Sequence, residues 1–193
     1  MITKLAQKTV DALCGSQMIG EEDKDLYIYG FFVLYSRLFF LIITVLFSLV
    51  FGIVWQGILM YIVFSLIRSY AGGVHASKES ICLITTSLSI LLCVVLIKTL
   101  IPYDNTAGIQ IVLLGEWCCI VILSPVDTPE KRLSKLEKKR YKLISCVIAT
   151  CVTIIACTFA YLRINGISIV CLVSLGFESV LLGLSRIKSK GLN

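Results

Sequence analysis

The sequence predicts an all-α, polytopic membrane protein that forms a single integral membrane domain over residues 1–193. Of its 193 residues, 58% are hydrophobic and only 16% are charged, and the mean hydropathy is +0.93. Soluble domains average about 45–50% apolar and about 25% charged residues. The charged residues also cluster and leave long uncharged runs between them. Six membrane-spanning helices of about 20 residues each use most of the chain and leave no room for a separate soluble domain.

Residues 1–26 are expected to form an amphipathic segment on the cytoplasmic surface of the membrane. We expect no cleavable signal peptide, because no apolar core of such a peptide stands at the start. Apolar and charged side chains fall on opposite helical faces, namely Ile2, Leu5, Ala6 and Leu13 against Lys4, Lys8 and Asp11.

Six apolar runs follow and are predicted to span the membrane. They cover residues 27–50, 52–67, 81–101, 108–124, 143–162 and 167–184. The second run is short, because 16 residues rise about 24 Å against a hydrocarbon core of about 30 Å. Either the bilayer thins there, or the polar stretch that follows dips below the headgroups and is hidden from bulk water.

Basic residues predict the orientation of the spans. Fifteen of the eighteen lysines and arginines lie in the N-terminal segment, in 68–80, in 125–142 and at the C-terminus, and these segments alternate with nearly uncharged connections. Positive loops face the cytoplasm, so both termini are expected there. A four-span arrangement would leave strongly apolar runs outside the bilayer. The net charge of +6 is then a topology signal, aided by anionic membrane lipid, and we expect no nucleic-acid partner.

Residues 68–82 form a polar stretch between the second and third runs, and they carry the candidate active site. This stretch contains the only histidine of the chain, His75, and Cys82 seven positions later. A neutral imidazole can take the proton of a thiol, and the resulting thiolate is a strong nucleophile. The alternative is a loop histidine beside a buried structural thiol.

A bend is required if these two side chains cooperate. On one straight helix they would lie about 10 Å apart, whereas proton transfer needs about 3 Å. Gly72 and Gly73 can break the helix, and Ser77 can cap the next one. Arg68, just upstream, is either a snorkelling anchor or a fixed cation that holds a carboxylate or a backbone carbonyl.

The remaining cysteines and the charges inside the spans are the other candidate sites. Most cysteines lie in apolar runs, no CxxC pair occurs and no second histidine is present, so we expect no metal and no cofactor. A charge at mid-bilayer costs at least about 2.5–3.5 kcal/mol. Three charged side chains are therefore expected to face a partner or an aqueous cleft: Arg37, Glu116 and Glu178.

The 125–142 segment is predicted to be a basic cytoplasmic loop, since Pro125 and Pro129 end the fourth run. Asp127 could orient the histidine as in a catalytic triad, and an Asx-turn is the simpler role. The basic residues are a topology signal or a binding surface for an acidic peptide, and they include Lys131, Arg132, Lys135, Lys138, Lys139, Arg140 and Lys142.

With these residues in view, the chain resembles the accessory gene regulator B (AgrB) family of membrane peptidases over nearly its whole length. The features that carry the resemblance are Arg68, Ala71-Gly72-Gly73-Val74-His75-Ala76, Cys82, and Ser124-Pro125-Val126-Asp127-Thr128-Pro129 ahead of the basic loop. The glycine motif at 71–76, with the cysteine seven positions after its histidine, is specific to the family.

The resemblance implies a cysteine endopeptidase in a bacterial cell membrane, with its active site at the cytoplasmic face. Its substrate is an AgrD-type propeptide of a cyclic quorum-sensing peptide, with Cys82 as nucleophile and His75 as base. The enzyme removes the C-terminal tail through an acyl-thioester, and a thiol or hydroxyl of the peptide then closes a thiolactone or lactone ring. A homodimer is expected by the same resemblance.

Two readings from other classes stay open on the residues alone. A small transporter or exporter would use Arg37, Glu116 and Glu178 as a polar path, and its transport would resist thiol alkylation. A non-catalytic scaffold would leave His75 and Cys82 without a role. Iodoacetamide separates these readings, because a catalytic Cys82 should react fastest of the nine cysteines.

Overall fold

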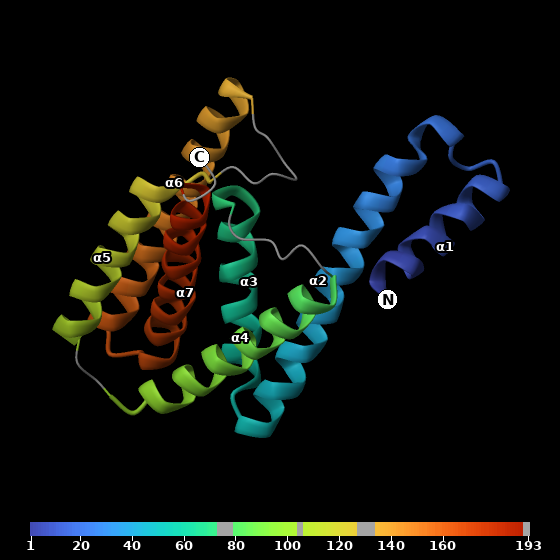
Figure 1. Ribbon diagram of the computed structural model, residues 1–193. Coiled ribbons are helices and arrows are strands. Elements are labelled where there is room, and N and C mark those ends of the chain that lie inside the picture. Colours follow the sequence, from blue (N-terminus) through green and yellow to red (C-terminus); the bar gives the residue numbers. More distant parts are fainter. Residues whose placement is uncertain (73–78, 104–105, 127–133, 191–193) are drawn as a thin grey trace. The chain divides into compact units, whose positions relative to one another are not determined.

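The computed structural model describes residues 1–72, 79–103, 106–126 and 134–190 (Figure 1). Throughout these ranges the regular structure is helical and no strand forms, which confirms the all-α prediction. The elements are α1 (Ile2–Gly15), a short 3-10 helix η1 (Glu21–Asp23), α2 (Lys24–Phe51), α3 (Val54–Ala71), α4 (Glu79–Leu100), α5 (Thr106–Leu123), α6 (Lys135–Tyr161) and α7 (Asn165–Lys190).

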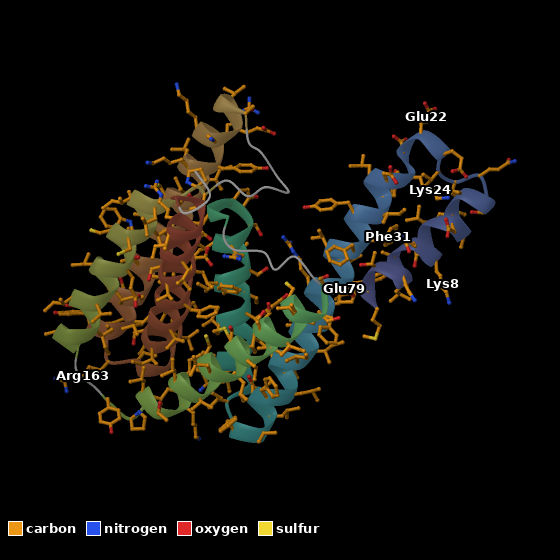
Figure 2. The ribbon with its side chains drawn as sticks, in the orientation of Figure 1. Lys8, Glu22, Lys24, Phe31, Glu79 and Arg163 are labelled. Carbon is orange, nitrogen blue, oxygen red and sulfur yellow. The ribbon has the colours of Figure 1, made fainter. Side chains whose placement is uncertain are left out.

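The chain divides into two units, Met1–Ile43 and Thr44–Asn193. In the first unit, α1 is joined to α2 by a hydrogen bond between the Thr9 and Tyr35 hydroxyls at 2.9 Å. Lys24, at the start of α2, forms an ion pair with Asp11 of α1 at 2.9 Å, and Figure 2 shows Lys24 at the turn between the two helices. These contacts tie the amphipathic helix back onto the first half of α2.

Helix α1 has one buried stripe within its unit. Ile2, Ala6 and Val10 are the buried residues of this helix, which is the spacing of one helical stripe. Leu5, also predicted to belong to the apolar face, is exposed, and burial within the protein does not test a face that is predicted to contact lipid. The position of α1 on the membrane surface stays a prediction.

In the second unit, α7 is the central helix and contacts α3, α4, α5 and α6. Three pairs mark its interface with α3: the Ser174 hydroxyl donates to the Met60 carbonyl at 3.4 Å, the rings of Phe64 and Phe177 lie 5.3 Å apart, and Arg68 meets Glu178. Since the residue numbers rise together on both helices, α3 and α7 run in the same direction.

Helix α5 packs on α7 and α6. Its Trp117 indole N–H donates to the Thr150 hydroxyl of α6 at 2.9 Å, and farther along the chain the hydroxyls of Ser124 and Ser145 are hydrogen-bonded to each other. These residue numbers run in opposite senses, so α5 and α6 are antiparallel. The arrangement matches the alternation expected of successive crossings.

In the described part of the chain, five helices are long and apolar enough to cross a membrane: α2 together with η1, α3, α4, α6 and α7. The predicted fourth span is α5, a shorter apolar helix. The parallel direction of α3 and α7 fits six crossings, because three helices, α4, α5 and α6, would then lie between them. The count of six and the location of the termini stay predictions.

Helix α6 begins eight residues before the predicted span at 143, so the expectation of a loop up to residue 142 is wrong. Ser134 caps the helix: its hydroxyl accepts from the Glu137 backbone N–H at 3.3 Å, and the Glu137 carboxylate accepts from the Ser134 N–H at 2.8 Å. This capping box, followed by lysine, leucine and arginine with good helix propensity, extends the helix beyond its apolar part.

Candidate functional site

The candidate site begins where α3 ends, at Ala71 and Gly72. Gly72 has φ +81° and ψ −162°, a backbone region that is essentially restricted to glycine. A helix cannot continue through this conformation, so the predicted break at Gly72 is confirmed. The described part of α4 starts at Glu79. The polar stretch is therefore not one straight helix from Arg68 to Cys82.

Val126, from the segment after α5, lies against this helix end. Its backbone N–H donates to the Ala71 carbonyl at 3.0 Å, and Gly72 and Val126 form an isolated parallel bridge. A Cβ at Gly72 would lie 2.5 Å from the Val126 carbonyl oxygen, so only glycine allows this approach. The structure thus joins the glycine motif to the proline-containing segment more than fifty residues later in the chain.

Arg68 contacts both of the partners predicted as alternatives for a fixed cation, a carboxylate and a backbone carbonyl. Its Nη1 donates to the Gly72 carbonyl at 3.0 Å and lies 3.7 Å from Glu178 Oε1 of α7. Glu178 is fully buried, whereas the Arg68 side chain is 20% exposed. Together with the Val126 N–H, the guanidinium satisfies the last carbonyls of α3, which a helix end leaves without intrahelical donors.

Cys82 lies in the first turns of α4 as a partly exposed free thiol. The buried residues of α4 begin only at Ile90, so the half of the helix that carries Cys82 is outside the packed core. In contrast, Cys93 and Cys171 are free thiols that are 3% exposed, as expected for structural cysteines.

Several predicted site residues lie outside the described residues. These are His75 and Gly73 of the glycine motif, the proposed cap Ser77, Asp127, and the basic residues Lys131 and Arg132. The distance between the imidazole and the Cys82 thiol is therefore not tested, and the catalytic pair stays a prediction.

The described basic residues lie on the first turns of α6. Lys138, Lys139 and Arg140 are exposed, and Lys135 is the first helical residue. The ring of Tyr141 packs edge-on against Tyr70 of α3, with 5.8 Å between centroids. This aromatic pair places the basic turns next to the end of α3.

Glu178 is confirmed as a buried charge with a partner, as the cost of burying charges requires. Glu116 lies against α7, since a Cβ at Gly176 would be 2.5 Å from its Oε1, and its Oε2 has no hydrogen-bond partner among the described residues. Arg37 is on the exposed side of α2. Among the described residues, no three His, Cys, Asp or Glu side chains are placed to hold a metal ion.

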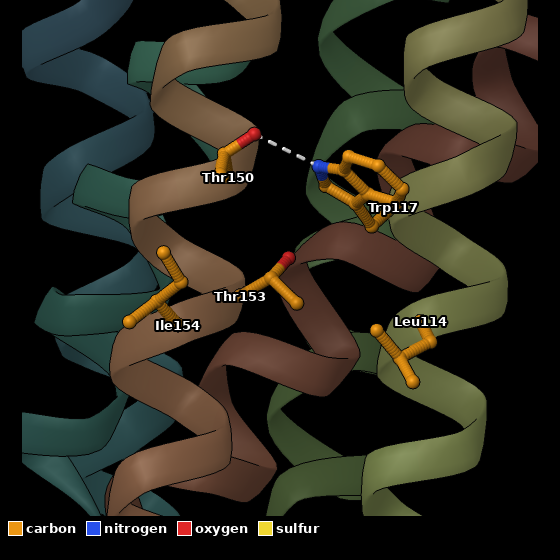
Figure 3. A pocket seen from close by; sticks show the side chains of 5 residues that line it. All are labelled: Leu114, Trp117, Thr150, Thr153 and Ile154. Carbon is orange, nitrogen blue, oxygen red and sulfur yellow. Dashed lines mark hydrogen bonds between the residues drawn. The ribbon is translucent and has the colours of Figure 1, made fainter.

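A pocket of about 180 Å³ opens between α5 and α6 (Figure 3). Its two threonine hydroxyls both donate to carbonyls one turn earlier on α6. The pocket offers apolar surface and belongs to helix packing. It is lined by Leu114, Trp117, Thr150, Thr153 and Ile154.

Sequence reasoning missed the contacts of Val126, the partner of Arg68 and the Tyr70–Tyr141 pair. One signal was present and overlooked: Ser134 three residues before Glu137 is the pattern of a capping box. No local signal pairs Arg68 with a carboxylate 110 positions away in the chain.

Comparisons with known proteins identify the family of the chain. The profile of the family described as accessory gene regulator B (AgrB) matches residues 2–182. An AgrB-like protein of Clostridium perfringens strain SM101 is 27% identical over 187 residues, which cover 93% of this chain and 83% of that protein. An AgrB-like protein 2 of C. perfringens strain 13 is 26% identical over 149 residues, 74% of this chain and 69% of that protein. No solved structure matches the chain. Since the profile covers nearly the whole sequence, the chain belongs to the accessory gene regulator B family of membrane proteins.

Proposed function

We propose that this protein is a membrane-embedded cysteine endopeptidase that removes the C-terminal tail of an AgrD-type propeptide at the cytoplasmic face. Family membership implies involvement in accessory gene regulator peptide processing. The observation that carries the finer proposal is the anchored end of α3. Arg68, Gly72 and Val126 hold the chain immediately before the segment with His75, and Cys82 follows as a partly exposed thiol in the first turns of α4.

In the proposed first step, His75 takes the proton of Cys82 and the thiolate attacks a carbonyl carbon of the propeptide. A carbon–sulfur bond forms and the carbon–nitrogen bond of the peptide breaks. The imidazolium gives its proton to the leaving amine, and the tail departs. The remaining peptide is then bound to Cys82 as an acyl-thioester, and no oxidant, metal or cofactor is needed.

In the second step, a thiol or hydroxyl within the bound peptide attacks the thioester. The new carbon–sulfur or carbon–oxygen bond closes the ring, and the Cys82 thiolate leaves and takes back a proton. When a peptide thiol attacks, the thioester on Cys82 is exchanged for a thioester in the ring. This exchange changes the free energy little, so the step requires no ATP. It does require that water be kept from the thioester, which a site at the membrane boundary favours.

Three single variants test the assignment in detergent-solubilised protein with a synthetic AgrD-type precursor. Cys82→Ala and His75→Ala should each abolish cleavage, since the nucleophile or its base is lost. Cys93→Ala is the matched control, because it removes a thiol from the same helix at a buried position and should cleave at the wild-type rate. Complete processing by the Cys82→Ala protein would rule out the covalent mechanism.

A further inference from the structure

The end of α3 is held from a distance by α7. Arg68 is the only described donor seen on the Gly72 carbonyl, at 3.0 Å, and its guanidinium is in turn paired with Glu178 at 3.7 Å. The carboxylate is fully buried and neither of its oxygens has a hydrogen-bond partner among the described residues. Its ion pair with Arg68 is therefore the interaction that accounts for a buried charge at this position.

The surroundings show why this pair can hold a fixed position. Phe64, one turn before Arg68 on α3, packs against Phe177, the residue directly before Glu178 on α7. Ser174, one turn before Glu178, donates to the Met60 carbonyl. Glu178 thus sits on a packed helix–helix contact, which restricts the motion of its carboxylate. A guanidinium paired with such a carboxylate loses its own freedom as well.

We infer that Glu178 is a positioning residue for the proposed active site. It orients the Arg68 guanidinium, Arg68 fixes the Gly72 carbonyl, and Gly72 sets the direction in which the chain leaves α3 toward His75, three residues later. Glu178 does not touch the substrate in this scheme and acts only through Arg68. The inference rests on the proposed function, since it assigns a role to the residue that supports the catalytic pair.

The protein contains a matched control for this inference. Glu116 is a second carboxylate packed against α7, and Glu116→Gln makes the same chemical change as Glu178→Gln without touching the Arg68 contact. Two buried thiols, Cys93 and Cys171, report loss of the fold, because they become accessible to iodoacetamide only if the helices separate.

The experiment measures iodoacetamide labelling of each cysteine by mass spectrometry, alongside cleavage of a synthetic AgrD-type precursor. In Glu178→Gln we expect labelling of Cys82 and kcat to fall at least about tenfold, with KM unchanged and the two buried thiols still protected. In Glu116→Gln both rates should stay within about twofold of wild type. Wild-type rates in Glu178→Gln, or equal losses in both variants, would overturn the inference.

If Glu178→Gln exposes the buried thiols, the double variant Arg68→Gln with Glu178→Gln is measured instead, because it removes both charges of this pair. A folded and slow double variant supports the inference, and a folded variant with wild-type rates overturns it. If wild-type protein shows neither cleavage nor fast Cys82 labelling, the proposed function fails by itself. Hydrogen exchange at the Val126 amide then tests whether Glu178 positions the end of α3. Exchange must be faster in Glu178→Gln than in Glu116→Gln, and equal exchange rates would refute the positioning role.

Discussion

Replacing Gly72 by alanine tests the anchored end of α3 directly. Alanine in this backbone region costs about 1–3 kcal/mol. Its Cβ would also lie 2.5 Å from the Val126 carbonyl oxygen, whereas ordinary contacts begin at 3.4 Å. The two segments must separate by about 0.9 Å, which stretches the 3.0 Å bond from the Val126 N–H to the Ala71 carbonyl beyond hydrogen-bond range. Losing that bond adds about 1 kcal/mol.

The total of about 2–4 kcal/mol corresponds to a fall in melting temperature of about 5–15 °C for a chain of this length. Tryptophan fluorescence can follow unfolding in detergent, because Trp55 and Trp117 lie in two helices of the same unit. A displacement of about 1 Å near a catalytic group also costs on the order of 100-fold in rate. We therefore expect cleavage by Gly72→Ala to fall by that factor.

Gly115→Ala is the matched control. Gly115 lies within α5 and a Cβ added there meets nothing within 4 Å, so alanine should leave stability unchanged or raise it by up to about 1 kcal/mol. If Gly72→Ala melts within about 1 °C of Gly115→Ala and retains full activity, the account of the α3 end is wrong.

Two further predictions concern other parts of the second unit. The first variant replaces four exposed basic residues on α6 by glutamine, namely Lys138, Lys139, Arg140 and Lys142. Precursor binding should then weaken about tenfold at low salt and lose most of its salt dependence. Arg163→Gln, at the opposite end of α6 (Figure 2), is the control, and an unchanged KM in the fourfold variant would leave the cluster as a topology signal only. Gly57→Leu should lower the melting temperature more than Gly115→Leu, because a side chain at Gly57 collides with Ser48 of α2. Small residues permit such close helix approaches in membranes. Equal melting temperatures of the two variants would contradict this prediction.

Much of the fold could be predicted from the sequence, because hydropathy reports each span locally. The predicted runs match α2 to α7 in order and overlap each of them, and the paired glycines marked the end of α3. Hydropathy failed where a helix continues out of the apolar region, as at residues 135–142 of α6. There the polar helix is stabilised by its N-terminal cap and by the helix propensity of its residues. A search for apolar runs detects neither.

The candidate site could be predicted only in part. The chemistry of Arg68 limited its partners to a carboxylate or a carbonyl, and the structure contains both. Which carboxylate pairs with it depends on the packing of α3 against α7, which brings Glu178 close in space from a distant part of the chain. The approach of Val126 to Gly72 depends on packing in the same way. No residue pattern within a single sequence encodes such contacts.

The acyl-enzyme is the most direct test of the proposed chemistry. Wild-type protein mixed with a synthetic AgrD-type precursor, quenched in acid and digested, should yield a Cys82 peptide heavier by the mass of the tail-less precursor less one water, and hydroxylamine should remove the addition. The Cys82→Ala protein should show no such adduct on any of its eight remaining cysteines. Cleavage that proceeds without a trapped thioester on Cys82, or an adduct on another cysteine, would contradict the mechanism.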